Sequence, residues 1–408
     1  MHGAAATTAL VQPKIITWRT SQRKPNLPLD RHMRLALPTL ALFLYIVASL
    51  IWWLPCRPWV KLAGGFALLA IGLKYLGYEK IGGSFIAPDF PPFLLLLMEF
   101  LYSAMVILAF LLLIKDCLAL LLLISRWLGG SWHLPFTPAI RGGALACTAL
   151  VLSLFGTWQS LRVPDVQTRE IPLPGLPAEL DGFTIVQLSD IHVGLLLNGQ
   201  WLNEVVRKTN ALAADLVVLT GDMIDGSPEA LRQDIAPLRA LQAKYGVYGI
   251  TGNHEYYFGV HRWLPVFEDL GIVMLQNECR TFSVQGKNLV LAGVPDPAAP
   301  HFGEVGPDRG FLQALPDGIR VLLQHRPSAA SGKDDVDLQL SGHTHGGHLF
   351  FLKWLIASFN GGLVGGLFDF DGAKLYVSPG TGVWAGFSCR LGAPSEIAHI
   401  ILRQPQGN

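Results

Sequence analysis

The chain has 408 residues, enough for two or three domains, and its charge is divided unevenly between two halves. Residues 1–163 carry 14 lysines and arginines against 5 acidic residues, whereas residues 164–408 carry 17 against 25. The acidic second half argues against nucleic-acid binding, which needs a basic surface. The five cysteines are odd in number and form no CxxC pair, so they predict neither a disulfide framework nor a zinc ribbon.

The first 34 residues are polar and basic, and we expect little fixed structure there. They predict either a solvated tail or a cytoplasmic anchor that touches anionic lipid headgroups. Residues 35–162 predict a helical transmembrane domain of about four helices. Residues 35–54 contain no charge over 20 residues, the length that spans a bilayer core. Three further apolar stretches follow, at 59–78, 93–114 and 142–161.

Residues 117–124 are apolar again, so the third stretch is either one long tilted helix or a helix with a short re-entrant piece. In the second stretch, Lys61 and Lys74 can extend their charges toward the membrane surface. Buried charge in a membrane is costly unless it is paired or hydrated. We therefore expect Glu99, Lys115 and Asp116 to pair between helices, with a polar feature for a lipid headgroup or partner as the alternative.

The basic tail predicts a cytoplasmic amino terminus by the positive-inside rule. Four crossings would then return the acidic half to the cytoplasmic face, and a fifth crossing would place it on the opposite side.

Residues 163–180 contain four prolines and predict a linker, followed by a domain over residues 181–405. In this domain short β-branched runs alternate with amphipathic segments, which predicts an α/β fold. A hairpin is expected to turn at residues 285–288.

Polar clusters follow five of the predicted strands directly. The strands are Phe183–Ser189, Leu216–Thr220, Val247–Thr251, Arg320–Leu323 and Val336–Leu340. The polar residues that follow them are Asp190 and His192, Asp222, Asn253 and His254, His325, and His343 and His345. The carboxyl ends of strands in an open α/β sheet are where sites are built, so we expect these side chains to meet.

Each cluster taken alone has an ordinary structural explanation, such as a surface pair, a turn or a buried histidine. Five clusters in order, all at strand ends, favour a common site. Asp oxygens and His nitrogens suit divalent metals, and two such metals can activate a water and neutralise a phosphate. The residues therefore predict a dinuclear metal hydrolase.

The order DxH, GDxxD, GNH[DE], H and GHxH over about residues 181–403 resembles that of calcineurin-like metallophosphoesterases. The resemblance implies a four-layer αββα sandwich, here preceded by the helical transmembrane domain. It also implies that Asp222 bridges two metals. The first metal would be held by Asp190, His192, Asp222 and His345, and the second by Asp222, Asn253, His325 and His343.

By the same resemblance, His254 is not a ligand but faces the scissile phosphate, and Asp225 orients it. A hydroxide that bridges the metals would attack phosphorus in line with the leaving oxygen, and His254 would protonate or hydrogen-bond the leaving group. Manganese is our first choice of metal, with iron, zinc and cobalt as alternatives.

The segment 346–370 is unusually apolar and follows two of the expected ligands. It predicts either two buried core strands or an apolar wall that docks on the membrane or admits acyl chains. The segment that starts with GHTHGG and the later segment YVSPGTGVWAGFSCRLGAPSEIAHIIL resemble the bacterial membrane-associated phosphodiesterase branch of the family. That branch often has Gln where His348 stands. Arg390 would bind a second phosphate or pair with Glu396.

We therefore expect an integral membrane phosphoesterase, by resemblance in a bacterial inner membrane, with its catalytic domain at the cytoplasmic face. The lipid bilayer is one expected partner, and the other is a phosphodiester or pyrophosphate substrate, lipid-linked in our first hypothesis. The alternatives are an enzyme for soluble substrates that the membrane only localises, and a non-catalytic scaffold. The sequence does not name a protein partner.

Overall fold

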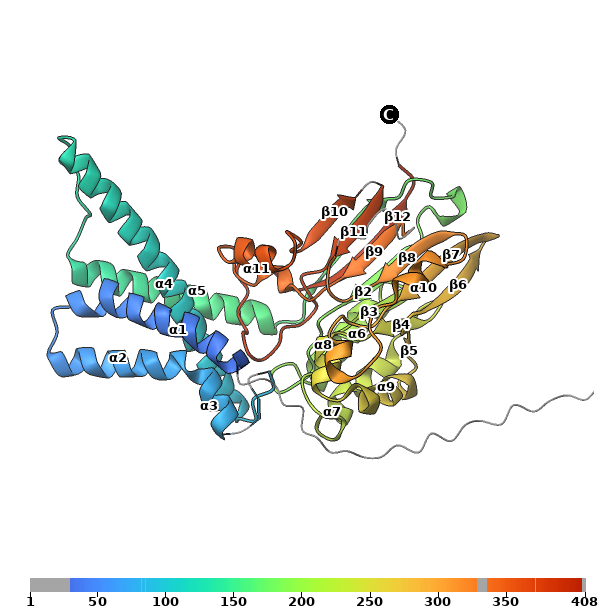
Figure 1. The fold of residues 1–408 in the computed structure, drawn as a ribbon, viewed down its shortest axis with the longest axis horizontal. Coiled ribbons are helices and arrows are strands. Elements are labelled where there is room, and N and C mark those ends of the chain that lie inside the picture. The colour runs from blue at the N-terminus through green and yellow to red at the C-terminus, as the bar shows by residue number, and fades with distance from the viewer. Residues whose placement is uncertain (1–29, 82, 85, 329–335, 371, 406–408) are drawn as a thin grey trace, which may run out of the picture.

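A computed structural model describes residues 30–81, 83–84, 86–328, 336–370 and 372–405. A bundle of helices precedes an α/β domain, and the two lie side by side (Figure 1). Most of the predicted basic tail, residues 1–29, lies outside the described residues, and the first helix begins at Asp30.

The bundle contains five α-helices and one 3-10 turn. They are α1 (Asp30–Ser49), η1 (Ile51–Trp53), α2 (Pro58–Gly72), α3 (Lys74–Ile81), α4 (Pro92–Trp127) and α5 (Pro138–Leu161). Within the described residues, α4 and α5 are long and apolar enough to cross a membrane. The pair α2 and α3, bent by 60°, is a third candidate, and Leu37–Trp53 is a shorter apolar helix. Four crossings therefore remain a prediction.

The third apolar stretch is one continuous helix, since α4 runs unbroken for 36 residues. At 1.5 Å per residue it is about 54 Å long, well beyond the hydrocarbon thickness of a bilayer. The re-entrant alternative for residues 117–124 is therefore wrong.

The charges in the bundle pair with one another. Nζ of Lys74 lies 2.6 Å from Oε1 of Glu99, and both side chains are fully buried. The prediction that Lys74 extends to the membrane surface is therefore wrong. Lys115 pairs with Asp116 at 2.9 Å. The predicted pairing between helices is therefore confirmed for Glu99, whereas the ion pair of Lys115 and Asp116 lies within α4. Asp116 reaches a second helix through the hydrogen bonds that it accepts from Tyr45 and Ser49 of α1.

Two six-stranded sheets form the α/β domain. The first has the order β1 (Asp165–Pro172), β12 (Glu396–Arg403), β2 (Thr184–Leu188), β3 (Leu216–Thr220), β4 (Val247–Ile250) and β5 (Val273–Met274). The second has the order β10 (Gly366–Phe370), β11 (Ala373–Val377), β9 (Leu338–Ser341), β8 (Ile319–Leu323), β7 (Lys287–Gly293) and β6 (Glu278–Val284). Strands β2 to β5 are parallel, as are β7, β8, β9 and β11.

The predicted β-hairpin is present. Strands β6 and β7 are joined by Gln285 and Gly286, both with positive φ, as a two-residue hairpin turn requires.

Helices cover both outer faces of the paired sheets (Figure 1). The helices and 3-10 turns are η2 (Ala178–Leu180), α6 (Gly199–Asn210), α7 (Pro228–Ile235), η3 (Ala236–Ala240), α8 (Asn253–Tyr257), α9 (Val260–Asp269), η4 (Ala299–Phe302), α10 (Arg309–Gln313), η5 (His345–Gly347) and α11 (Lys353–Phe359). One apolar core fills the space between the sheets, a second lies under α6, α7 and α9, and a smaller one lies beside α10. The predicted four-layer αββα sandwich is confirmed.

The predicted linker over residues 163–180 is wrong, because its first part is a strand. β1 pairs in parallel with β12 along all eight of its residues, and Ile171 is fully buried in the core between the sheets. The prolines suggested a linker, but β1 is an edge strand, where proline is tolerated. The domain therefore begins at Asp165, directly after α5.

The apolar segment 346–370 does not form two buried strands. It contains η5, α11 and β10, and α11 has no buried residue. Trp354 is 70% exposed and Phe359 is 79% exposed. Just before α11, Phe351 stacks on Phe110 of α4 with ring centroids 3.9 Å apart. The segment thus joins the α/β domain to the helical bundle and leaves an apolar helix uncovered.

Candidate metal centre

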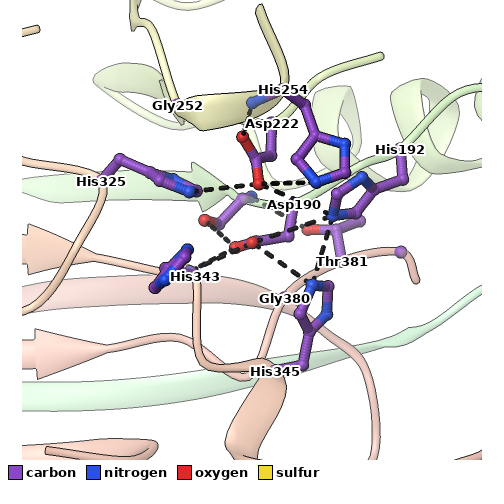
Figure 2. Close-up of polar contacts among 12 residues, drawn as sticks. Asp190, His192, Asp222, Gly252, His254, His325, His343, His345, Gly380 and Thr381 are labelled. Atoms are coloured by element: carbon purple, nitrogen blue, oxygen red, sulfur yellow. Dashed lines mark hydrogen bonds and ion pairs between the residues drawn. The ribbon is translucent and has the colours of Figure 1, made fainter. Parts of the chain in front are cut away.

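The loops that follow β2, β3, β4, β8 and β9 meet at one edge of the sandwich and bring together the Asp and His side chains predicted as ligands (Figure 2). Among the described residues, three groups of His and Asp side chains have ligand atoms within 4.8 Å of one another. They are Asp190 with His192 and His345, His192 with Asp222 and His254, and Asp222 with His325 and His343. Asp222 belongs to two of these groups and so lies between the other members.

In the first group the ring nitrogens and the carboxylate converge. Nε2 of His192 lies 3.2 Å from Nε2 of His345, and Oδ1 of Asp190 lies 3.6 Å from the latter atom. In the third group, Nε2 of His325 lies 3.2 Å from Oδ2 of Asp222. Nδ1 of His325 lies 2.7 Å from the carbonyl oxygen of Thr220, which turns Nε2 toward the pocket.

Oδ1 of Asn253, in the loop after β4, is buried and lacks a hydrogen-bond partner among the described residues. The buried Nε2 of His325 has the carboxylate of Asp222 beside it, at 3.2 Å. Buried polar atoms are normally satisfied, so the orphaned oxygen of Asn253 indicates a missing ligand. Both atoms are good ligands for a divalent cation, and the pocket also holds carboxylates. The side chains present therefore fit metal ions, including a contribution from Asn253.

Asp225 contacts two histidines at once. Its Oδ1 lies 2.6 Å from Nδ1 of His254, as its predicted orienting role requires, and 2.9 Å from Nδ1 of His192. The second contact was not anticipated from the sequence. Asp225 therefore turns Nε2 of both rings toward Asp222, at 3.7 Å for His254 and 3.9 Å for His192.

Glu255 holds two of the loops in place, a role that sequence reasoning missed. Its buried carboxylate accepts hydrogen bonds from the backbone N–H groups of Asp222, Met223 and Gly252, at 3.0, 2.7 and 2.7 Å. The loops after β3 and β4 are thereby joined. The acidic residue that ends the GNHE motif is the only signal for this role in the sequence.

Backbone strain is concentrated among the expected ligands. Positive φ angles between 48° and 70° occur at Asp190, His192, Asp222, His343 and His345. Such conformations in residues other than glycine cost on the order of 1–3 kcal/mol each and persist only where the surroundings impose them. The hydrogen bonds of Glu255 supply part of that constraint at Asp222.

Two glycines allow the loops to approach closely. A Cβ at Gly252 would lie 2.2 Å from Oδ1 of Asp222, and one at Gly342 would lie 1.9 Å from Oγ of Ser189. Any side chain at these positions would displace the carboxylates of the pocket.

Arg390 also contacts the site, and it does so without the ion pair to Glu396 that was one of the two roles considered for it from the sequence. Its fully buried guanidinium donates to Nδ1 of His345 at 3.0 Å, and to the carbonyl oxygens of His345 and Gly382 at 3.1 and 2.7 Å. Glu396 instead accepts hydrogen bonds from Tyr376 and Ser378. No local pattern indicates this contact, because Arg390 is 45 positions from His345.

Charges within the pocket separate the histidines into two kinds. Burial disfavours the charged ring of His325, but the charge of Asp222 and a hydrogen bond to it outweigh burial and raise its pKa to about 10. Burial also disfavours the charged ring of His254, but the charges of Asp222 and Asp225 outweigh burial and raise its pKa to about 9. Burial lowers the pKa of His343 and His345 well below the usual range. At neutral pH the first two rings therefore carry protons and the last two are neutral.

Comparisons with known proteins agree with this geometry. Residues 183–347 match the family model described as calcineurin-like phosphoesterase. A transmembrane protein with metallophosphoesterase domain from Bos taurus is 35% identical over 280 residues, which cover 65% of this chain and 63% of the relative. An uncharacterized metallophosphoesterase of Campylobacter jejuni is 36% identical over 266 residues, which cover 62% of this chain and 68% of the relative.

The uncharacterized metallophosphoesterase YkuE of Bacillus subtilis is 32% identical over 276 residues, which cover 64% of this chain and 94% of the relative. The chain therefore matches almost the whole of the Bacillus relative but less than two thirds of the bovine one. Relatives occur among both bacteria and animals.

We predict that metal binding releases a proton from His325. A ring with a pKa of about 10 is protonated at pH 7, and a metal needs its free lone pair, so apparent affinity should rise with pH. Titration calorimetry with Mn²⁺ in buffers of different ionisation enthalpy should show about one proton released per protein from this ring. The variant His325→Gln should release correspondingly less, and equal release by both proteins would contradict the prediction.

Proposed function

Because the chain belongs to the calcineurin-like phosphoesterase family, we propose that it is a membrane-anchored phosphoesterase that uses two metal ions to hydrolyse a lipid-linked phosphodiester or pyrophosphate. The position of Asp222 between two groups of imidazole side chains carries this proposal. Manganese is our first choice of metal. The family relationship itself implies a metal-dependent phosphoester hydrolase.

The proposed ligands divide between two metals. Asp190, His192 and His345 would hold the first and Asn253, His325 and His343 the second, with Asp222 shared. Two bound divalent cations supply an activated water and neutralise the charge of the phosphate.

His254 is the proposed proton donor to the leaving group. Its pKa of about 9 keeps it protonated at neutral pH, and Asp225 holds Nδ1, so the remaining proton lies at Nε2 on the Asp222 side of the ring. The backbone N–H of His254 also donates to Oδ1 of Asp222 at 2.8 Å, which fixes the ring relative to the proposed ligands. A positioned acid of this kind contributes roughly 10²–10⁴-fold to a rate.

An exposed apolar surface near the pocket supports a lipid-linked substrate and contact with the bilayer. Phe350, Trp354 and Phe359 are each more than half exposed, and they follow His345 by only 5 to 14 positions. An apolar patch on a globular domain marks an interaction surface. This one adjoins α4 through the stacking of Phe110 on Phe351, so it continues the apolar surface of a candidate membrane span.

The catalytic domain is proposed to face the cytoplasm of a bacterial cell, from the inner membrane. α1 begins and α5 ends on the side of the bundle that faces the catalytic domain (Figure 1), which supports an even number of crossings. A cytoplasmic domain is also the orientation that the positive-inside rule favours for a chain whose first 34 residues are basic.

We predict that His254→Ala lowers kcat about 10²–10⁴-fold for a phosphodiester with an alkyl alcohol leaving group. The loss should be much smaller for a p-nitrophenyl ester, because p-nitrophenolate leaves without a proton. Bound Mn²⁺ should stay at the wild-type level. His261→Ala, at a histidine whose side chain is 67% exposed, is the matched control. Equal losses on both substrates would exclude proton donation, and lost metal would make His254 a ligand.

We predict that acyl chains raise kcat/KM. The wild-type protein in lipid nanodiscs should prefer an acylated nucleotide-sugar diphosphate to its deacylated form by at least tenfold. Trp354→Ser with Phe359→Ser should remove that preference and leave hydrolysis of the deacylated form unchanged. Trp132→Ser, at another exposed tryptophan of the chain, is the control. Equal kcat/KM for both forms in the wild-type protein would favour a soluble substrate.

We predict that a reporter fused after the last residue lies in the cytoplasm. A fluorescent protein at that position should be bright, whereas alkaline phosphatase, which needs the periplasm, should be inactive. The opposite pair of results would place the domain on the other side of the membrane and contradict the proposed orientation.

A further inference from the structure

The loop formed by residues 384–391, between β11 and β12, contacts the helical bundle on one side and the metal centre on the other. We propose that a buried ion pair in the bundle, Lys74 with Glu99, positions the ligand His345 by fixing this loop and thereby Arg390. The proposal rests on the two-metal function above. It makes the helical bundle part of the metal centre's support as well as an anchor.

The ion pair is held by aromatic residues of the bundle. Nζ of Lys74 lies 2.6 Å from Oε1 of Glu99 and 4.2 and 4.7 Å from the ring centroids of Tyr102 and Tyr75. The hydroxyl of Tyr78 donates to Oε1 of Glu99 at 3.0 Å. A buried ion pair needs such additional partners, because its desolvation offsets most of its attraction.

The same side chains hold the loop. Lys74 and the hydroxyl of Tyr75 both donate to the carbonyl oxygen of Gly386, at 3.0 and 2.8 Å. The backbone N–H of Ser388 donates to Oε2 of Glu99 at 3.4 Å. Each member of the ion pair therefore forms a hydrogen bond with the loop backbone: Lys74 with the carbonyl oxygen of Gly386, and Glu99 with the N–H of Ser388. The two bonds hold the loop at two points.

α5 holds the next residues of the loop. The backbone N–H of Arg390 donates to the carbonyl oxygen of Gly156 at 3.0 Å. A Cβ at Gly156 would lie 2.4 Å from Sγ of the buried Cys389, so only glycine permits this approach. The contacts from α3, α4 and α5 thus fall on the residues that directly precede Arg390 and on Arg390 itself.

Arg390 connects the loop to the metal centre. Its guanidinium donates to Nδ1 of His345, which leaves Nε2 of the ring facing Asp190 and His192. Residues that hold the second nitrogen of a metal-binding histidine set its orientation, and their loss typically weakens metal binding about 10- to 100-fold. Arg390 is a positioning residue by this criterion, and the ion pair acts through it.

His345 belongs to only one of the two proposed metal sites, so the test measures the two sites separately. Stepwise Mn²⁺ affinities would be determined by calorimetry on the full-length protein in nanodiscs. Lys74→Met with Glu99→Gln should weaken one of the two sites roughly tenfold and leave the other at the wild-type value, and Arg390→Met should weaken the same site roughly 10- to 100-fold. Lys115→Met with Asp116→Asn removes a different ion pair of the bundle and should change neither affinity.

A second pair of variants tests the loop without removing charge. Gly156→Ala should weaken the same single site because its new methyl group displaces Cys389. Adding Cys389→Ala removes the clashing sulfur and should restore the wild-type affinity. Unfolding would instead lower both affinities, and the second substitution would not rescue it.

Wild-type affinities in both the Lys74→Met with Glu99→Gln variant and the Gly156→Ala variant would overturn the inference, as would equal weakening of both sites without rescue. A wild-type protein that binds no Mn²⁺ would overturn the proposed function itself, and the inference with it.

Discussion

The burial of three carboxylates in one small pocket is the constraint on which the rest of the site depends. Asp190, Asp222 and Asp225 are almost inaccessible to solvent, and buried carboxylates are stable only beside positive charge or hydrogen-bond donors. Protons on His254 and His325 supply part of that charge, and two divalent cations would supply more. The left-handed backbone at the ligands, the close glycines and the buried Glu255 all serve to hold these like charges together.

The same principle operates a second time inside the helical bundle. Lys74 and Glu99 are fully buried; Lys74 donates a hydrogen bond to the loop that carries Arg390, and Glu99 accepts one from it. A charge in an apolar bundle is costly, so its position is fixed by the partners that neutralise it. The bundle and the catalytic domain also share one apolar core, in which Leu349, Cys389 and Leu391 pack among residues of α1, α4 and α5. The two parts of the chain therefore form one structural unit rather than an anchor joined to an independent domain.

Local pattern predicted the α/β fold and the convergence of the ligand residues, whereas the four-layer sandwich followed from the family resemblance. Each ligand directly follows a short apolar run, and such runs form parallel strands whose ends share an edge. The errors arise where the deciding partner is distant. β1 was mistaken for a linker because its partner β12 lies more than 220 positions away, and Lys74 was assigned to the membrane surface because hydropathy does not reveal Glu99 or Gly386. The role of Glu255 and the contact of Arg390 with His345 were not predicted for the same reason, since both depend on groups of other loops.

Anomalous diffraction at the manganese absorption edge, from crystals of the full-length protein grown with Mn²⁺, tests the central claim most directly. Our account predicts two peaks on either side of Asp222, one beside Asp190, His192 and His345 and the other beside Asn253, His325 and His343. A pocket with no peak, or with one metal bound only by residues outside these groups, would contradict it.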